Sequence, residues 1–443
     1  MKMTVIRRTP LDALITRKLG LSGDMLNRDL IESYQLKKLN ETIQFVLKNS
    51  PFYKNKFSGI DNPGIKSFKD LERFPMTSAD DIAKQALQFL CISQDEISRV
   101  VTLESSGTTG NPKRIYFTPL DQELTIDFFR HGMSTLVKKG DRVMILLPGE
   151  RPGSVGDLLS AALKRFGVIP VPHGVVRDMN ETLSVIRRHE INSLVGIPVQ
   201  VFALARYSEF KGIDIHLKSV LLSTDNLPSL IVRELERLWG CRVFDHYGMT
   251  EMGLGGGVEC DAHAGYHLRE ADMYFEIVDD SGKCPPDGKY GEVVFTTLTR
   301  SGMPLIRYKT GDISRFLTIQ CECGTQLKLL DKIAGRRENL IKTRTDRSFS
   351  ILDLDEIMFA TPGVIDYTAS VNDILNASKL SISALTINTS GEHASQNKAY
   401  DIRKIASIIN EKLGTDLTIK IEESHCMGDL TIARGKRRIA VSR

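Results

Sequence analysis

The sequence predicts an α/β protein: a large N-terminal domain with mostly parallel sheets flanked by helices and a small antiparallel, barrel-like sheet, then a small, mobile α+β C-terminal domain. Three regions predict this class. Short apolar runs alternate with helical patterns between residues 142 and 245, strand patterns follow one another between 265 and 315, and mixed patterns begin near 336. Because 443 residues exceed the length of one ordinary core, at least two folding units are expected.

The first hundred residues have a mainly helical pattern. Apolar residues recur at helical spacing in residues 30–48, and the pattern stops at Asn49-Ser50-Pro51. Ser67 and Ser78 are each followed by acidic residues within one turn, as N-cap residues often are. We therefore expect a short helix after each of these serines.

The central region predicts the parallel sheet. Its apolar runs are short, and helical patterns at residues 154–166 and 227–239 lie between them. Strands that alternate with helices form largely parallel sheets with helices on both faces. The expected strands are residues 142–147, 168–171, 193–197, 219–222 and 242–245.

The last two regions differ from the central one. Turn residues at 280–282 and 286–288 separate strand patterns, which indicates a smaller antiparallel sheet. After residue 336 the patterns indicate a compact α+β unit, so we predict domains of residues 1–335 and 336–443. The expected strands are residues 274–278, 292–297, 305–308, 364–371, 380–387 and 418–422, and the expected helices of the last unit are residues 353–360 and 397–413.

Composition and charge exclude several classes of protein. Apolar residues make up 41% and charged residues 26% of the chain, which is typical of a globular protein. A net charge of +4 does not favour a nucleic acid or a membrane surface as partner, and the basic stretch 434–438 fits a solvated tail or a site for one anion. Neither a membrane span nor a signal peptide is predicted. Seven irregularly spaced cysteines predict no disulfide framework and favour a reducing cytoplasm.

The sharpest sequence feature is a loop of small and hydroxyl residues that ends in a lysine, Ser105-Ser106-Gly107-Thr108-Thr109-Gly110-Asn111-Pro112-Lys113. Small residues let backbone N–H groups approach an anion, the hydroxyls add donors, and Lys113 adds a positive charge. The spacing differs from that of the P-loop NTPases. The alternative interpretation is a flexible Ser/Gly turn.

This segment resembles the signature loop of the adenylate-forming superfamily, which includes acyl-CoA ligases, luciferases and nonribosomal adenylation domains. The resemblance implies that the loop is mobile and that Ser106, Thr108, Thr109 and Lys113 hold the β- and γ-phosphates of ATP. The same implied site includes Ser105, Gly107 and Gly110.

A second segment, Asp245-His246-Tyr247-Gly248-Met249-Thr250-Glu251, resembles the Tyr-Gly-x-Thr-Glu motif of that superfamily. The resemblance implies that Thr250 bonds the α-phosphate, that Glu251 binds Mg²⁺ through oxygen, and that Tyr247 covers the adenine. Asp245, His246, Gly248 and Met249 would line the same nucleotide site. His246 would touch the substrate, or it would be a packed histidine. Taken alone, the segment could also be a solvated loop.

Three further positions match superfamily motifs. Residues 304–312 resemble the segment in which Asp312 would accept hydrogen bonds from the ribose hydroxyls, and residues 335–342 resemble the hinge, from which Arg336 would reach the ribose or a phosphate. Lys436 stands where many members have the lysine that stabilises charge between the carboxylate and the α-phosphate. The alternatives are a surface loop for the first two and a solubilising tail for the third. Residues 223–225 depart from the superfamily pattern at the adenine.

The segments 50–54 and 74–77 and the short last unit resemble the phenylacetate-CoA ligase branch. The branch implies an aromatic carboxylic acid as substrate, ATP, Mg²⁺ and coenzyme A as its other reactants and cofactors, and a homodimer. Lys436, Thr250 and Glu251 would be its catalytic residues. The alternative function is an adenylyltransferase that stops at AMP transfer, as in a coenzyme F390 synthetase, and a third is a nucleotide-binding protein without catalysis.

Four residues around the antiparallel region have metal-ligand chemistry. Cys260, His267 and the pair Cys321 and Cys323 could bind one tetrahedral, structural Zn²⁺. His263 competes with His267 as the nitrogen ligand, and the spacing of the cysteine pair is tighter than the usual Cys-x2-Cys. The alternative is a set of unrelated residues in reduced loops.

Overall fold

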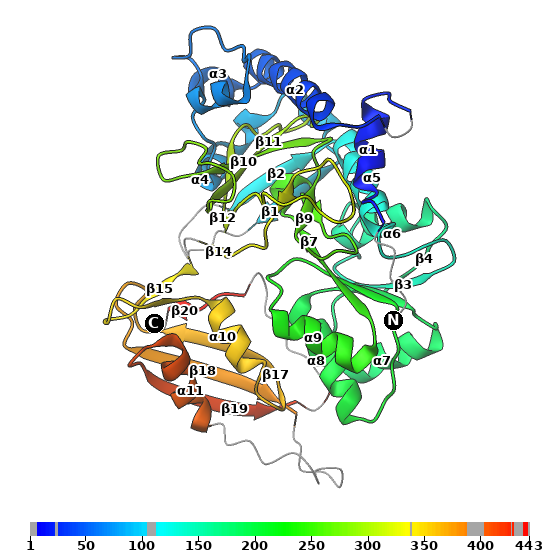
Figure 1. Cartoon of the computed structure of the whole chain (residues 1–443), viewed down its shortest axis with the longest axis vertical. Coiled ribbons are helices and arrows are strands. Elements are labelled where there is room, and N and C mark those ends of the chain that lie inside the picture. Colours follow the sequence, from blue (N-terminus) through cyan, green and yellow to red (C-terminus); the bar gives the residue numbers. More distant parts are fainter. Residues whose placement is uncertain are drawn as a thin grey trace. The chain divides into compact units, whose positions relative to one another are not determined.

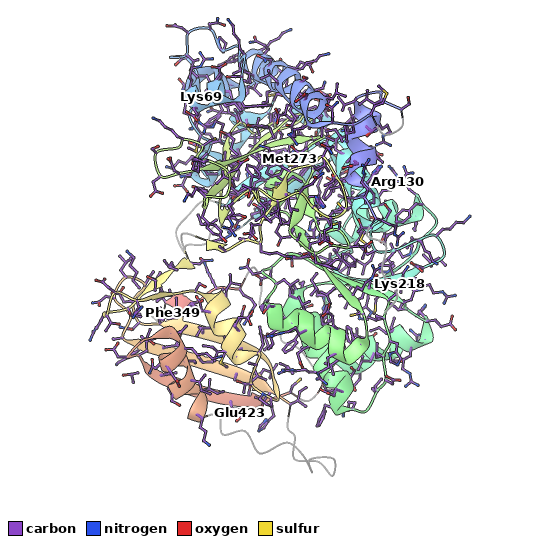
Figure 2. All side chains as sticks on the ribbon, in the orientation of Figure 1. Lys69, Arg130, Lys218, Met273, Phe349 and Glu423 are labelled. Carbon is purple, nitrogen blue, oxygen red and sulfur yellow. The ribbon has the colours of Figure 1, made fainter. Side chains whose placement is uncertain are left out.

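The computed structural model describes residues 7–22, 25–103, 112–336, 339–387, 403–426, 428 and 437–441. It contains two compact units, and each is assembled from segments far apart in the sequence. Unit 1 comprises residues 1–138, 151–167 and 246–334, and unit 2 comprises residues 139–150, 168–245 and 335–443. Figure 1 labels many elements of both units, and Figure 2 adds side chains.

Unit 1 begins with helices that have well-formed ends. Asn27 accepts a hydrogen bond from the Leu30 amide at 3.0 Å and caps α2, and Pro51 follows its last residues. Thr118 and Asp121 form a capping box at the start of α5. The helices of unit 1 are α1 (Leu11–Lys18), α2 (Arg28–Asn49), α3 (Pro51–Lys56), α4 (Ala79–Gln85), α5 (Pro119–Met133) and α6 (Val155–Lys164), with short 3-10 turns η1 (Phe68–Arg73), η2 (Ala86–Phe89), η3 (Gln94–Glu96) and η4 (Thr250–Met252).

In the described part of the chain, the strands of unit 1 pair antiparallel with one another, apart from one parallel bridge between Thr77 and Tyr308. The hairpin of β1 (Arg99–Leu103) and β2 (Lys113–Phe117) flanks the predicted phosphate loop, and β10 (Met273–Val278), β11 (Gly291–Thr297) and β12 (Tyr308–Ser314) form a meander. The short strands β8 (Gly257–Val258), β9 (Tyr266–Leu268) and β13 (Leu329–Leu330) extend from the last two residues of β7. This region confirms the small antiparallel sheets.

One predicted strand of this region is wrong. Of residues 305–308, only Tyr308 lies in a strand, because β12 begins there. Arg307 has a φ of 46°, which interrupts an extended backbone. Its buried guanidinium lies 3.0 Å from the Glu276 carboxylate, and this ion pair fixes the turn.

Unit 2 contains the predicted parallel sheet. β4, β3, β5, β6 and β7 lie side by side in that order with parallel register, and β5 and β6 are buried throughout. Gly240, with a φ of 61°, ends the helix before β7. The strands are β3 (Arg142–Leu146), β4 (Ile169–Pro172), β5 (Ser193–Gly196), β6 (Ser219–Leu222) and β7 (Arg242–Tyr247), and the helices are α7 (Met179–Arg188), α8 (Pro198–Phe210) and α9 (Ser229–Trp239).

The C-terminal part of unit 2 is a mixed sheet with two helices. Its strands have the order β19-β18-β17-β20, in which only β17 and β18 pair antiparallel. The apolar residues of this part and those of α7–α9 belong to one continuous core. The elements are β14 (Gly335–Arg336), β15 (Ile341–Lys342), β16 (Ser348–Phe349), α10 (Ile351–Met358), β17 (Val364–Val371), β18 (Lys379–Thr386), α11 (Arg403–Leu413), β19 (Thr418–His425) and β20 (Ala440–Val441). The α/β class is confirmed, and the C-terminal part mixes helices with strands as the sequence predicts.

Candidate active site

Unit 1 brings Lys113 and Glu251 together although 138 residues separate them. The Lys113 ammonium lies 2.5 Å from Glu251 Oε1, and the Tyr308 hydroxyl donates a hydrogen bond to the same oxygen at 2.9 Å. Glu251 is only 2% exposed. Burial by itself raises the pKa of Glu251, but the Lys113 ammonium and the Tyr308 hydroxyl hold it below its usual value. The cluster is therefore a buried, ionised carboxylate that already faces a cation.

The turn that carries Glu251 is fixed by neighbouring polar groups. Arg300 donates from Nη1 to the Glu251 carbonyl oxygen at 2.8 Å, and the Thr125 hydroxyl donates to the Gly253 carbonyl oxygen at 2.8 Å. Gly253 ends η4 with a φ of 68°, a conformation that favours glycine. These contacts hold Thr250 and Glu251 at the end of β7, where the sequence motif requires them.

A second contact joins Tyr247 and Asp312. The Tyr247 hydroxyl donates to Asp312 Oδ2 at 3.0 Å, and the Asp312 amide donates to the Thr310 hydroxyl at 3.0 Å. Both Tyr247 and Asp312 are buried. Since Tyr308 and Asp312 are both on β12, the two contacts place that strand beside the Tyr247–Glu251 segment.

His246 lies against two aromatic rings of α5. Its ring centroid is 5.9 Å from that of Phe128 and 6.2 Å from that of Phe129. Burial lowers the pKa of His246 to about 4, so the imidazole is neutral at pH 7. Gly255 completes this packing, because a Cβ there would lie 2.3 Å from the Phe128 ring. The arrangement is that of a packed histidine beside the motif, one of the two interpretations of the sequence.

The structure describes only some of the predicted site residues. Lys113, Tyr247, Glu251 and Asp312 come together as stated, and Gly248, Met249 and Thr250 lie partly buried in the same turn. Asp245, buried, and Arg336, partly buried, belong to unit 2. Ser105, Ser106, Gly107, Thr108, Thr109, Gly110 and Lys436 lie outside the described residues.

Two residues of this site were missed in the sequence. Tyr308 lies within the 304–312 segment, but its hydrogen bond to Glu251 depends on a contact across 57 residues. Arg300 supports Glu251 through the main chain and stacks on the Phe117 ring, with its guanidinium carbon 4.5 Å from the ring centroid. Neither residue has a sequence pattern that could have revealed it.

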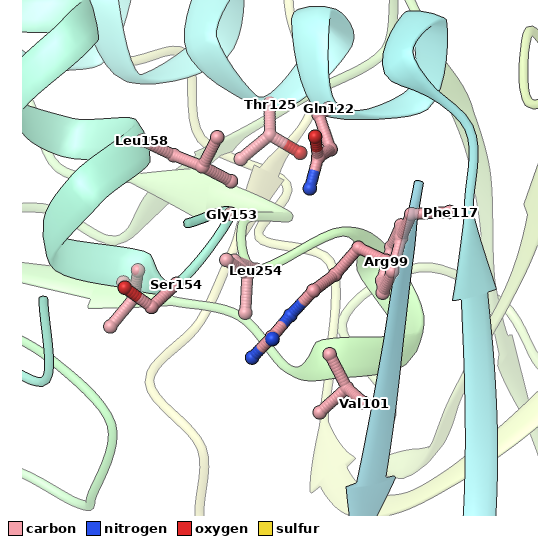
Figure 3. Close-up of a pocket in the computed structure, with 10 residues that line it drawn as sticks. Arg99, Val101, Phe117, Gln122, Thr125, Gly153, Ser154, Leu158 and Leu254 are labelled. Carbon is pink, nitrogen blue, oxygen red and sulfur yellow. The ribbon is translucent and has the colours of Figure 1, made fainter. Parts of the chain in front are cut away.

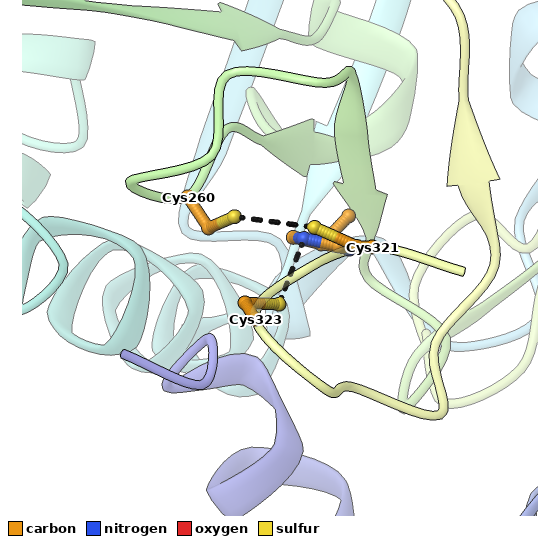
Figure 4. Close-up of side chains that lie close together, drawn as sticks. Cys260, Cys321 and Cys323 are labelled. Carbon is orange, nitrogen blue, oxygen red and sulfur yellow. Dashed lines mark hydrogen bonds between the residues drawn. The ribbon is translucent and has the colours of Figure 1, made fainter. Parts of the chain in front are cut away.

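Cys260, His267, Cys321 and Cys323 form a buried cluster in unit 1, and Figure 4 labels its three cysteines. Cys260 Sγ and Cys321 Sγ are 3.6 Å apart, and Cys323 Sγ and His267 Nε2 are 3.4 Å apart. A tetrahedral Zn²⁺ with ordinary bond lengths needs ligand separations of about 3.8 Å and about 3.6 Å for these two kinds of pair. The four ligand atoms all lie within 4.8 Å of one another. The residues present therefore fit a closed zinc site.

His267, and not His263, is the histidine of this cluster. His267 is fully buried on β9, and its Nδ1 makes no hydrogen bond within the described part of the chain. His263 is partly exposed, and its Nδ1 lies 3.4 Å from the Glu259 carboxylate.

Known proteins resemble the chain over most of its length. Residues 95–299 match the family model described as AMP-binding enzyme. A phenylacetate-coenzyme A ligase from Thermus thermophilus is 28% identical over 78% of this chain and 78% of its own, and one from Aromatoleum evansii is 26% identical over 93% and 94%. The crystal structure of a 2-hydroxyisobutyryl-CoA ligase in the postadenylation state has a TM-score of 0.79 and 20% identity, covering 93% of this chain and 90% of its own, which supports the fold alone. Among the described helices, none has both the length and the apolar character needed to cross a membrane.

Proposed function

The chain belongs to the adenylate-forming superfamily, in its phenylacetate-CoA ligase branch, and on this premise we propose that it is an AMP-forming ligase that joins an aromatic carboxylic acid to coenzyme A. The observation that carries the proposal is the convergence of Lys113, Glu251 and Tyr308 beside the Tyr247–Asp312 pair. Three segments separate in the sequence supply these groups. Each belongs to a segment that resembles a nucleotide-binding motif.

ATP would be held by groups that suit its parts. Asp312 is a buried acceptor for ribose hydroxyls, Tyr247 is positioned by it, and Lys113 carries the charge that phosphates need. In the proposal, Thr250 contacts the α-phosphate, and Arg336, Lys436 and the loop residues Ser105–Gly110 complete the site. The ionised Glu251 carboxylate suits Mg²⁺, a cation that prefers oxygen ligands, and it already accepts the Lys113 ammonium.

The reaction proceeds in two balanced steps. A carboxylate oxygen of the acid bonds to the α-phosphorus of ATP while the bond to pyrophosphate breaks, which gives the acyl-adenylate. The thiolate of coenzyme A then attacks the acyl carbon, and AMP leaves with the bonding electrons. No protein nucleophile takes part, so the chain acts through positioning and through stabilising charge at the phosphates.

Several finer assignments belong to the same proposal. We place the domain boundary between residues 335 and 336, with a C-terminal domain that moves between the two steps. We also propose a homodimer in the cytoplasm. The Cys260, His267, Cys321 and Cys323 cluster would bind one structural Zn²⁺, since four protein ligands leave no position for a substrate.

The test of activity is isotope exchange between pyrophosphate and ATP, with a panel of aromatic acids, followed by AMP release with and without coenzyme A. We expect acid-dependent exchange and coenzyme A-dependent AMP release. Glu251→Gln should lower the exchange rate by about 100-fold or more, because it removes charge at the reacting phosphates. Glu236→Gln, on an exposed position of α9, should not change it. AMP transfer to coenzyme F420 would favour the adenylyltransferase, and ATP binding without exchange would contradict both enzymes.

The test of zinc is metal analysis of the purified protein. We expect about one Zn²⁺ per chain in the wild type and loss of metal in Cys321→Ser, with a lower melting temperature. Cys284→Ser is the matched control, because Cys284 is exposed and outside the cluster. The assignment would be contradicted if the wild-type protein contains no zinc and Cys321→Ser has the same melting temperature as the wild type.

A further inference from the structure

Unit 1 contains a pocket that the predicted nucleotide residues do not line. It has a volume of about 150 Å³ and lies among β1, β2, α5, the start of α6 and Leu254, as Figure 3 shows. Apolar side chains provide most of its wall, among them Val101, Phe117 and Leu158. A cavity of about 150 Å³ is large enough for one benzene ring. The pocket therefore fits a ring-sized apolar body.

The exception in this apolar wall is Arg99. Burial alternates along β1, so that Arg99, Val101 and Leu103 share its covered face, and Figure 3 shows the Arg99 side chain extending into the pocket. Its Nε is buried without a hydrogen-bond partner, and no carboxylate of the described residues forms an ion pair with it. Arg99 as a whole is only partly buried, but a buried guanidinium N–H without a hydrogen-bond partner is costly. The geometry therefore calls for an anionic partner from outside the chain.

The start of α6 adds to this positive potential. Ser154 is the N-cap residue of α6, yet its hydroxyl does not cap the helix and is buried without a partner. The first amides of a helix attract negative charge. The exposed Asp157 accepts a hydrogen bond from the Gly153 amide at 2.8 Å, so its carboxylate is engaged outside the pocket wall. Gln122, on α5, supplies a further polar group.

The pocket adjoins the predicted catalytic turn. Thr125 lines the pocket and donates to the Gly253 carbonyl oxygen at 2.8 Å, and Leu254 is the next residue of that turn. Phe117 lines it too and packs under Arg300, whose Nη1 donates to the Glu251 carbonyl oxygen. A ligand in the pocket would thus have one end toward Thr250 and Glu251 and the other at Arg99.

We propose that this pocket receives the part of the acid that is not activated, and that Arg99 binds a second anionic group there. This inference rests on the proposed ligase function and names its substrate class as a ring-sized dicarboxylic acid. One carboxylate is adenylated, and the other pairs with the Arg99 guanidinium. Arg99 is then the residue that determines specificity.

The experiment compares three acids in pyrophosphate–ATP exchange: 4-carboxyphenylacetate, its neutral methyl ester at the ring carboxyl, and phenylacetate. The wild type should have a kcat/KM at least about tenfold higher for the diacid than for the ester, since a hydrogen bond to a charged group has that effect or more. Arg99→Met should abolish this preference, because the diacid then loses its charged partner while the ester and phenylacetate lose none. Arg114→Met, an exposed arginine on β2, should retain it. A wild type that does not discriminate, or an Arg99→Met that loses all three acids equally, would overturn the proposal.

A binding measurement without nucleotide separates this proposal from the ligase function. The diacid alone should raise the melting temperature of the wild type and of Arg114→Met, but not that of Arg99→Met. Exchange with phenylacetate but no preference for the diacid would remove the Arg99 role and leave the ligase. Diacid binding that depends on Arg99, without any pyrophosphate–ATP exchange, would leave the Arg99 role and remove the ligase function. If Arg99→Met does not fold, Arg99→Lys must show a reduced but measurable diacid preference at an unchanged melting temperature.

Discussion

Units 1 and 2 bury different chemistry. Unit 1 encloses ion pairs, among them Arg307–Glu276 at 3.0 Å and Arg269–Asp272 at 2.7 Å, with every side chain at most 3% exposed. Unit 2 has buried apolar strands and one large apolar core, and its ion pairs include Lys218–Asp141 at 2.6 Å and Arg437–Asp355 at 2.5 Å. Removing one partner of a buried ion pair leaves a buried charge uncompensated, which is strongly destabilising. We therefore expect unit 1 to depend on single ion pairs and unit 2 on shape and volume.

The largest effect is expected for the Arg307–Glu276 pair of unit 1. Glu276→Gln leaves the buried Arg307 without its counter-charge and should lower the free energy of unfolding by about 3–5 kcal/mol. The double variant Glu276→Leu with Arg307→Met should recover most of this loss, because no charge is then left alone. Denaturant unfolding measures both. If the single and double variants lose the same free energy of unfolding, then side-chain shape decides stability at this site of unit 1, as it is expected to do in unit 2.

In unit 2 the corresponding change is the removal of apolar volume. Leu354, on α10, is fully buried, and Leu354→Ala should lower the free energy of unfolding by about 2–5 kcal/mol through lost contacts and a cavity. Leu354→Met keeps the volume and should cost less than about 1.5 kcal/mol. Denaturant unfolding of both variants tests this, and similar losses would contradict a volume-dependent core.

Two buried carboxylates, Asp355 of unit 2 and Asp272 of unit 1, should respond to acid in opposite directions. Burial raises the pKa of Asp355 in unit 2 to about 6, despite Arg437 and Tyr367 beside it. Between about pH 4 and 6 the unfolded chain has lost this proton while the folded chain keeps it, so the free energy of unfolding falls as pH rises. Asp355→Asn should remove this slope, which amounts to about 2–3 kcal/mol.

The carboxylate of Asp272 in unit 1 provides the opposite case. Burial opposes its charge, but Arg269 and Lys18 lower its pKa to about 2. It therefore stabilises the fold above about pH 4, and that contribution is lost as pH falls toward 2. Unfolding of Asp272→Asn and Asp355→Asn across pH 2–7 measures both slopes. Slopes of the same sign would contradict the opposite pKa shifts of these two carboxylates.

The smallest effect is expected at the Tyr247–Asp312 contact. Tyr247→Phe removes one hydrogen bond to the carboxylate that would bind ribose and should raise KM for ATP by about twofold to tenfold. Tyr290→Phe is the control, because Tyr290 is 52% exposed and its hydroxyl contacts Asp331 at 3.3 Å. Steady-state kinetics with varied ATP would show whether the contact acts on nucleotide binding or only on folding.

The sequence by itself determined the parallel sheet and the α/β class. It also singled out Lys113, Tyr247, Glu251 and Asp312, which come together in the structure. It could do so because alternating apolar runs and short motifs are local properties of the chain. The sequence left His263 and His267 open as ligands, and it predicted a strand at 305–308 that the buried Arg307 turn replaces.

Only the tertiary structure decided the contacts between distant segments. Tyr308 bonds Glu251, Arg300 supports the same turn, and Arg99 enters a pocket, although nothing near them in the sequence distinguishes these residues. The tertiary structure also decided that each unit is assembled from three separate segments of the chain. Which side chains meet across a fold depends on how strands and helices pack, and apolar periodicity indicates that a face is buried without naming the residues that cover it.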